Sequence, residues 1–298
     1  MNIRDLKYLM ALMEHQHFGK AASACFVSQP GLSMQIQKLE DELGVQLIER
    51  NNKSLLFTDI GLKIAERARH IIAEVDEIYD LAKREKDPYS GQLTIGVIPT
   101  LAPYFLPSMI PQLKKQYPQL SLYLVEEKTE YLVDALQKGK MDAAFLALPV
   151  EQKNCVILPL FQEEFLLAIP QNHSLAHLKS IHASQMRHQE LFLLEEGHCL
   201  REQALSFCVK VNAKEVQNFR GTSLETLRLM VASGIGMTLI PKLACYHHEN
   251  IAYIPFQDPK PFRSIGLTWR STSAKSMLLE ELAYFIIDFF KKNQKTLL

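Results

Sequence analysis

The chain contains 298 residues, enough for two or three domains that each bury their own hydrophobic core. Hydrophobic residues make up 47% of the sequence and charged residues 22%, values that exclude disordered, collagen-like and purely coiled-coil proteins. The 33 Lys and Arg side chains balance 33 Asp and Glu side chains, so evidence for nucleic-acid binding has to come from a motif rather than from net charge.

The sequence predicts a cytoplasmic protein without a metal or a cofactor. Charged residues interrupt the first fourteen positions, and no later run reaches the roughly 18 apolar residues of a membrane-spanning helix. The histidines between positions 173 and 188 lack a cysteine or carboxylate at ligand spacing. The glycines of Gly234-x-Gly236 follow a predicted helix, whereas dinucleotide-binding glycines follow a strand. The five dispersed cysteines do not form a disulfide scaffold.

Residues 1–58 are predicted to form a small helical domain that ends in a hairpin. Two short helices precede a third, which starts after Ser28 and ends at Gly44, residues that suit an N-cap and a C-cap. The third helix carries an apolar stripe at gaps of four, three and four residues, formed by Leu32, Ile36, Leu39 and Leu43. Residues 47–57 then alternate around a polar tip, as the wing of a winged helix does.

The second and third helices of this domain leave two interpretations open. Helices joined by a tight turn, the later one with polar side chains near its N-terminus, are typical of a helix-turn-helix that enters the DNA major groove. A helical core without DNA contact is the other interpretation, and the periodicity alone favours it because helix pairs of this kind are weak signals.

A long helix is predicted over residues 59–88. Its apolar residues alternate at gaps of four and three, the spacing of a coiled-coil seam, at Ile64, Ala68, Ile71, Val75 and Ile78. Charged residues flank this seam on both sides, which favours dimerisation through the helix over packing on its own domain.

The rest of the chain is predicted to be an α/β domain. Strand-like and helix-like segments alternate from Leu93 onward, a pattern typical of largely parallel strands with ligands at their C-terminal ends. We expect residues 91–162 and 267–298 to form one lobe and residues 163–266 to form a second. The chain would pass between the lobes twice, as in two-lobed proteins that enclose a cleft.

Specific motifs resemble a known family. Ser28-Gln29-Pro30-Gly31-Leu32-Ser33, with Phe57-Thr58-x-x-Gly61, resembles the winged helix-turn-helix domain of LysR-type transcriptional regulators. Leu93-x-Ile95-Gly96 and Val231-Ala232-Ser233-Gly234-Ile235-Gly236 resemble the effector domain of that family, which has a two-lobed fold like that of periplasmic binding proteins. Gly197-His198-Cys199-Leu200-Arg201, with Cys208, resembles the members that sense hydrogen peroxide.

The resemblance implies a homodimeric or homotetrameric activator that binds double-stranded promoter DNA. RNA polymerase and a thiol reductant system are the further partners that it implies. Bases or their surroundings would be contacted by Gln29, Pro30 and Ser33, and phosphates or the groove edge by Lys38 and Arg50. The full set of DNA-binding residues expected from the resemblance is Ser28, Gln29, Pro30, Ser33, Lys38, Arg50 and Lys53.

By the same resemblance, Cys199 is the reacting thiol and Cys208 its redox partner. Gly197 suits a turn into a helix that starts near Cys199, where the helix dipole and unpaired N–H groups stabilise an anion. His198 and Arg201 lie nearby in the sequence and are expected to stabilise the thiolate. Cys208 falls on the apolar side of the segment, which suits a buried and unreactive thiol.

A disulfide between these cysteines requires the helix to open. Nine helical residues separate the thiols by about 13.5 Å, whereas a disulfide needs Cα atoms within about 7 Å. Peroxide would first give a sulfenic acid at Cys199, which Cys208 would then resolve. If opening costs about 3 kcal/mol, the reduction potential rises by roughly 60 mV, so the bond is easily reduced again.

The reaction also needs donors that orient the peroxide and stabilise the departing hydroxide. By resemblance, Thr100 and Thr129 supply hydroxyls and Arg263 stabilises the thiolate, although either threonine could instead cap a helix. Asn218 occupies a position at which a histidine would be expected, which leaves the role of a second imidazole open.

Two other functions remain possible at this point. The chain could be a LysR-type regulator that binds a small metabolite in the cleft between the lobes, or a thiol peroxidase enzyme. A peroxidase would need a reductant-docking site, for which the sequence has no recognisable feature, so we expect a regulator rather than an enzyme.

Overall fold

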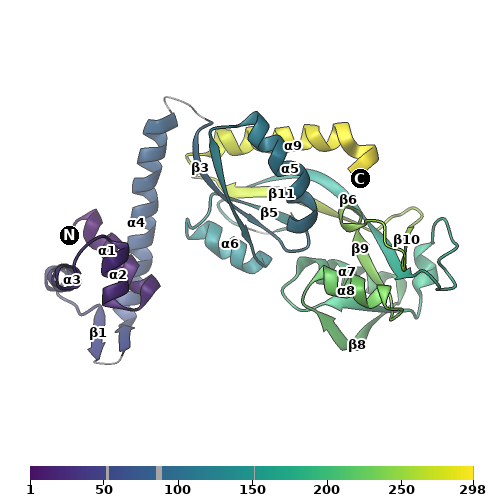
Figure 1. Cartoon of the computed structure of the whole chain (residues 1–298), viewed down its shortest axis with the longest axis horizontal. Helices are drawn as coiled ribbons and strands as arrows, with labels where there is room; N and C mark the ends of the chain where they lie inside the picture. Colours follow the sequence, from purple (N-terminus) through teal and green to yellow (C-terminus); the bar gives the residue numbers. More distant parts are fainter. Residues whose placement is uncertain (52–53, 85–88, 151, 298) are drawn as a thin grey trace. The chain divides into compact units, whose positions relative to one another are not determined.

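The computed structural model of the protein describes residues 1–51, 54–84, 89–150 and 152–297 (Figure 1). The chain divides into two compact units, and each is described by itself. The first unit comprises Met1–Lys86 and Lys138–Lys140, and the second comprises Asp87–Gln137 and Met141–Leu298.

The first unit is a helical domain with a two-stranded wing. Its elements are α1 (Ile3–His15), α2 (Phe18–Ala24), α3 (Gln29–Leu43), β1 (Ile48–Asn51), β2 (Ser54–Phe57) and α4 (Asp59–Arg84). The predicted cap residues are confirmed, since the Ser28 hydroxyl accepts the Gly31 N–H at 3.2 Å and Gly44 ends α3 at φ +68°. The antiparallel pairing of β1 with β2 confirms the predicted hairpin.

The wing is held against α3 and α4 by short-range polar contacts. The Glu40 carboxylate accepts the N–H groups of Leu47 and Ile48 at 2.7 and 3.0 Å. The Thr58 hydroxyl caps α4 by accepting the Gly61 N–H at 3.0 Å. A Cβ at Gly61 would lie 2.1 Å from the Leu47 carbonyl oxygen, so only glycine allows this close approach of helix and wing.

The predicted dimerisation seam on α4 divides into two parts. Ala68 is 1% exposed and lies in the hydrophobic core of the first unit, and Ile64 packs against the same core. Ile71 and Ile78 are 43% and 63% exposed, and Val75 is half-buried. The first two seam positions therefore serve their own domain, and only the later positions offer an apolar stripe to a partner.

The second unit is built around a seven-stranded sheet. Its elements are β3 (Gly91–Val97), α5 (Ala102–Gln116), β4 (Leu120–Glu126), α6 (Thr129–Gln137), β5 (Ala143–Leu148), β6 (Cys155–Pro170), η1 (Ala183–Met186), β7 (Glu190–Leu194), α7 (Cys199–Val211), β8 (Lys214–Gly221), α8 (Leu224–Ala232), β9 (Thr238–Pro241), η2 (Lys242–Ala244), β10 (Ile251–Pro255), β11 (Phe262–Arg270) and α9 (Ser276–Leu297). The strand order is β10-β6-β11-β5-β3-β4, with β9 also paired to β6.

The expectation of largely parallel strands is wrong. In the seven-stranded sheet β3 is parallel to β4 and β5, whereas β11, β6, β9 and β10 pair antiparallel. The sequence pattern missed this because β6 and β11 carry the chain from one hydrophobic core to the other without a crossover helix.

Two hydrophobic cores lie along these strands. One contains residues from Leu93 to Phe161 and from Ile265 to Phe290, and the other contains residues from Phe165 to Phe256. The long strand β6 runs through both, as the teal ribbon in Figure 1 shows, and the expected lobe boundary at 162/163 falls inside it. A continuous strand therefore connects the two lobes.

We expect Ile36→Ala to unfold the first unit selectively. Ile36 is fully buried, and removing its side chain should cost about 2–5 kcal/mol. Met34→Ala on the same helix, where the side chain is 67% exposed, is the matched control. Trp269 is the single tryptophan and is buried in the second unit. In urea titrations, Ile36→Ala should lower the midpoint of a far-UV circular dichroism transition and leave the Trp269 fluorescence transition in place. A shift of both transitions would show that the units do not unfold independently.

Candidate functional site

Cys199 is the first residue of helix α7. Gly197 precedes it at φ +88° and His198 is the N-cap, which confirms the predicted turn and helix start. The first N–H groups of an α-helix have no partner within the helix, and the helix dipole places positive potential there. The Cys199 sulfur is therefore attached at the place on α7 where an anion is best stabilised.

The two cysteines of α7 belong to different environments. Cys199 is half-buried and packs against the hydrophobic core of the lobe that contains β3, β4 and β5. Cys208 is 3% exposed and lies inside the core of the other lobe. Burial raises the pKa of the Cys208 thiol to about 11, and the Glu215 carboxylate adds to the rise.

Thr100 and Thr129 lie at neighbouring strand ends. Strands β3 and β4 are parallel and adjacent, and Thr100 follows the first whereas Thr129 follows the second. The chain after β4 stays joined to β3 through a hydrogen bond from the Glu127 N–H to the Val97 carbonyl at 3.2 Å. The C-terminal edge of these strands thus presents both hydroxyls, as expected for a binding edge of parallel strands.

The Arg263 side chain donates hydrogen bonds to Thr100. Its guanidinium is buried and donates to the Thr100 hydroxyl at 2.9 Å and to the Thr100 carbonyl at 3.1 Å. A third donor reaches Glu163 at 2.7 Å, and Glu163 is fully buried. Because the Thr100 oxygen accepts from Arg263, its own hydrogen is left to donate to another group. This geometry supports a role of Arg263 in orienting Thr100, whereas the sequence had suggested a direct role at the thiolate.

Three buried polar atoms, two on residues at the N-terminal end of α7 and one on the first residue of α6, have no hydrogen-bond partner among the described residues. They are His198 Nε2, Thr129 Oγ1 and Gln203 Oε1. Burial, followed by the nearby Lys128 ammonium, lowers the pKa of His198, so its imidazole is held in the neutral form at neutral pH. Buried polar atoms are ordinarily paired, so these three are available to a small polar molecule.

Gln203 is a further candidate site residue, which the sequence pattern did not indicate. It lies four residues after Cys199 in α7, and residues at that spacing share one helix face. This spacing could have identified it, but a lone glutamine carries little signal without knowledge of which face is buried.

Arg201 does not take the predicted place beside the thiolate. Its guanidinium donates to both Glu215 oxygens, at 2.6 and 3.0 Å, and to the Leu194 carbonyl at 2.9 Å. This buried ion pair raises the pKa of Arg201 and lowers that of Glu215. Arg201 points to the Cys208 side of α7 because residues seven apart share a face, so it fixes the helix to β8.

Most of the expected DNA-binding residues lie on the outer side of α3. Gln29, Pro30 and Lys38 are exposed, and Ser33 is half-buried. Ser28 is exposed and caps the helix. Lys53 and the side chain of Arg50 lie outside the described residues. Phe26, in the turn before α3, is 95% exposed at φ +56°, and the sequence analysis had not singled it out.

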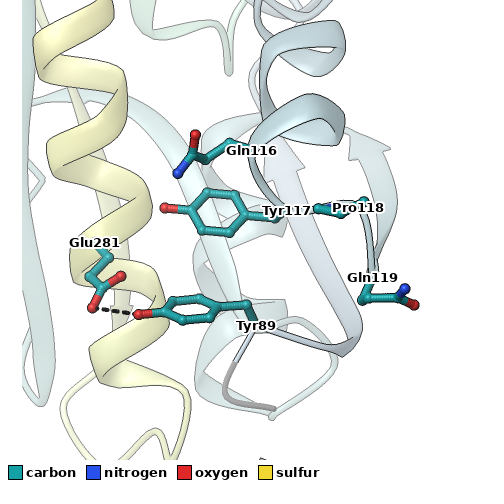
Figure 2. A pocket seen from close by; sticks show the side chains of 6 residues that line it. All are labelled: Tyr89, Gln116, Tyr117, Pro118, Gln119 and Glu281. Carbon is teal, nitrogen blue, oxygen red and sulfur yellow. Dashed lines mark hydrogen bonds between the residues drawn. The ribbon is translucent and has the colours of Figure 1, made fainter.

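A recess of about 370 Å³ in the second unit lies apart from the cysteines and is shown in Figure 2. Tyr89 stacks on Tyr117 with ring centroids 5.6 Å apart, and its hydroxyl donates to Glu281 at 3.0 Å. Tyr89 follows the segment that leads out of the first unit, so these contacts fix the beginning of the second unit to α9.

The described residues contain neither a cluster of metal ligands nor a helix suited to cross a membrane. No three His, Cys, Asp or Glu side chains there gather into a group that could hold a metal ion. None of the described helices is long and apolar enough to cross a membrane.

Comparisons with known proteins match both units. A bacterial regulatory helix-turn-helix profile of the lysR family matches residues 3–62, and the LysR substrate binding domain matches residues 86–291. A "hydrogen peroxide-inducible genes activator" of Pectobacterium carotovorum subsp. carotovorum is 45% identical, over 100% of this chain and 99% of that protein. Full-length OxyR C199D from Pseudomonas aeruginosa is 37% identical, with a TM-score of 0.78 over 96% of this chain and 94% of that one. The oxidised form of OxyR, 42% identical, has a TM-score of 0.64 over 69% of this chain and 98% of that one.

We expect a strong difference in reactivity between the two thiols of α7. With a pKa of about 11, Cys208 carries about one thiolate in a thousand at pH 8, and its burial limits access further. Brief iodoacetamide labelling of the reduced protein should therefore modify Cys199 first, as measured by mass spectrometry of the peptide that contains each cysteine. Cys208→Ser is the control and should leave the labelling rate of Cys199 unchanged. Equal labelling of the two residues in native protein would contradict this assignment.

Proposed function

The chain belongs to the LysR family of bacterial helix-turn-helix regulators, and we propose that it is a DNA-binding transcriptional activator that senses hydrogen peroxide through Cys199 and Cys208. The observation that carries this proposal is the placement of both thiols on one helix. Cys199 lies at the polar N-terminus among unpaired donors and acceptors, and Cys208 lies in a hydrophobic core.

The first step is oxidation of Cys199. Its thiolate attacks one oxygen of hydrogen peroxide, the O–O bond breaks, and the departing hydroxide takes up a proton to become water. The sulfur becomes a sulfenic acid and the peroxide is reduced by two electrons. In this proposal the Thr100 and Thr129 hydroxyls donate to the peroxide oxygens, and His198 Nε2 and Gln203 Oε1 supply further polar contacts. The hydrogen bond from Arg263 to Thr100 and the unpaired state of the other three atoms support these roles.

The second step is disulfide formation. The Cys208 sulfur attacks the sulfenic sulfur of Cys199, the S–O bond breaks, and a second water leaves. Both residues lie in an unbroken α7, so about 13.5 Å of helix separates their Cα atoms. A disulfide tolerates about 7 Å at most, so α7 has to open and Cys208 has to leave its core. Oxidation is thereby coupled to a change in the packing of the second lobe.

In this proposal the change in packing is transmitted from the effector unit to the DNA-binding unit. Two copies that pair through the exposed stripe of Ile71, Val75 and Ile78 would place two α3 helices on one duplex, and contacts between effector units would complete a homotetramer. RNA polymerase and a cytoplasmic thiol reductant system are the further partners that we propose. In this proposal the reaction with peroxide changes the state of the regulator, and the protein acts as a regulator and not as an enzyme.

Substitution of each cysteine should give a distinct result. Cys199→Ser should abolish peroxide consumption and disulfide formation, because a serine hydroxyl is not ionised at pH 7. Cys208→Ser should still react at the wild-type rate but stop at the sulfenic acid or overoxidise, since the resolving thiol is missing. Stopped-flow kinetics and mass spectrometry after a brief peroxide pulse measure both outcomes. If the wild-type thiols remained reduced after the pulse, a regulator that binds a metabolite would be the better explanation.

Substitutions on α3 should separate affinity from sequence specificity. Lys38→Ala should weaken binding to cognate and scrambled duplexes alike and reduce the salt dependence by about one unit of log–log slope, because one phosphate contact is lost. Gln29→Ala should mainly reduce the preference for the cognate duplex, as expected for a base contact. Fluorescence anisotropy titrations at several salt concentrations distinguish the two. An unchanged slope for Lys38→Ala would rule out its phosphate contact.

A further inference from the structure

Lys128 connects the two lobes at the turn that precedes Cys199. It lies in the loop between β4 and α6, on the lobe that carries Thr129. Its ammonium donates to Glu195 at 2.5 Å and to the Glu196 carbonyl at 3.1 Å, both in the turn that leads into α7 on the other lobe. The lysine stem also passes over Gly197, where an added Cβ would lie 3.0 Å from Lys128 Cδ.

We propose that Lys128 is a positioning residue that holds the turn before Cys199 in the reduced arrangement and thereby shifts the thiol–disulfide equilibrium toward the reduced form. This inference rests on the proposed function, because it concerns the same pair of thiols. Lys128 has no sulfur contact of its own and acts through residues 195–197.

The contacts of Lys128 join the loop after β4, which can keep its position when α7 opens, to the turn of residues 195–197, which has to move. The loop after β4 continues the sheet of one lobe, and this sheet does not have to change when α7 opens. The turn of residues 195–197 is continuous with Cys199, so opening of α7 pulls on it. The ion-paired hydrogen bond to Glu195 and the hydrogen bond to the Glu196 carbonyl exist in the reduced form, and both are then weakened or lost in the disulfide form. An interaction made in only one of two states shifts the equilibrium toward that state.

The electrostatics around the turn point in the same direction. Lys128 lowers the pKa of Glu195 through its hydrogen bond and charge, and it contributes to the lowered pKa of His198. Lys128 therefore favours an ionised Glu195 and, after burial, contributes to a neutral His198 imidazole, whereas the Glu195 carboxylate acts on the pKa of that imidazole in the opposite direction. A neutral His198 adds no second positive charge beside Lys128, so the bridge persists at neutral pH.

The size of the effect is modest because both side chains are partly exposed. Lys128 and Glu195 are 38% and 37% exposed, and solvent weakens ion pairs between exposed side chains. We therefore expect removal of the lysine to favour the disulfide by up to about fivefold in the equilibrium constant. On the two-electron scale this corresponds to a reduction potential about 20 mV more negative.

The test is a redox titration of the full-length protein in dithiothreitol buffers, with the Cys199–Cys208 disulfide quantified by mass spectrometry. Lys128→Met should favour the disulfide about fivefold, and Glu195→Gln should shift it in the same direction by less, because the Glu196 contact remains. Lys128→Arg should stay close to wild type, since the charge and donors are kept. Lys179→Met, at an exposed lysine of the same unit, is the matched control and should have no effect.

The salt dependence of the thiol–disulfide equilibrium is an independent test of the role of Lys128. Raising salt from about 0.05 to 1 M shortens the Debye length from over 10 Å to about 3 Å, so it should shift the wild-type equilibrium toward the disulfide and leave Lys128→Met nearly unchanged. Two outcomes would overturn the inference. If wild type forms the disulfide and Lys128→Met titrates identically, Lys128 has no influence on the switch although the proposed function stands. If wild type forms no Cys199–Cys208 disulfide at all, the proposed function and this inference both fail.

Discussion

An intact α7 prevents its two cysteines from bonding, and the redox site depends on this constraint. The helix rises about 1.5 Å per residue, so nine residues hold the two backbones about twice as far apart as a disulfide allows. The same helix gives the thiols opposite surroundings, with Cys199 at its N-terminus and Cys208 in the core. Chemistry at one end can therefore be completed only by a change in structure, which is what converts an oxidation into a signal.

Two sets of polar contacts connect the lobes. Arg263 fixes Thr100, which follows β3, and Glu163, which lies in the middle of β6. Glu163 also accepts the Leu243 N–H of η2 at 2.8 Å. Lys128 makes a weaker, more exposed connection to the turn before α7. The buried contacts keep Thr100 and Glu163 in place, and the exposed contact of Lys128 can be released at small cost.

The first unit uses one continuous helix for two purposes. The early part of α4 packs Ala65 and Ala68 into the core under α1, whereas its later part leaves Ile71 and Ile78 exposed. A coiled-coil spacing cannot distinguish these uses, because both require an apolar residue every three or four positions. Which positions serve the domain and which are left for a partner depends on where the other helices end.

The sequence by itself determined the elements and the chemistry of this protein. Caps such as Ser28 and Gly44, the turn at Gly197, and the apolar stripe of α3 are local features, and local hydrogen bonding and periodicity specify them. Motif resemblance identified Cys199 and Cys208. Only the tertiary structure decided the antiparallel course of β6 and β11, the pairing of Arg201 with Glu215, the role of Arg263 at Thr100, and the inclusion of Gln203. Each of these depends on which residues distant in sequence become neighbours, and neither periodicity nor spacing contains that information.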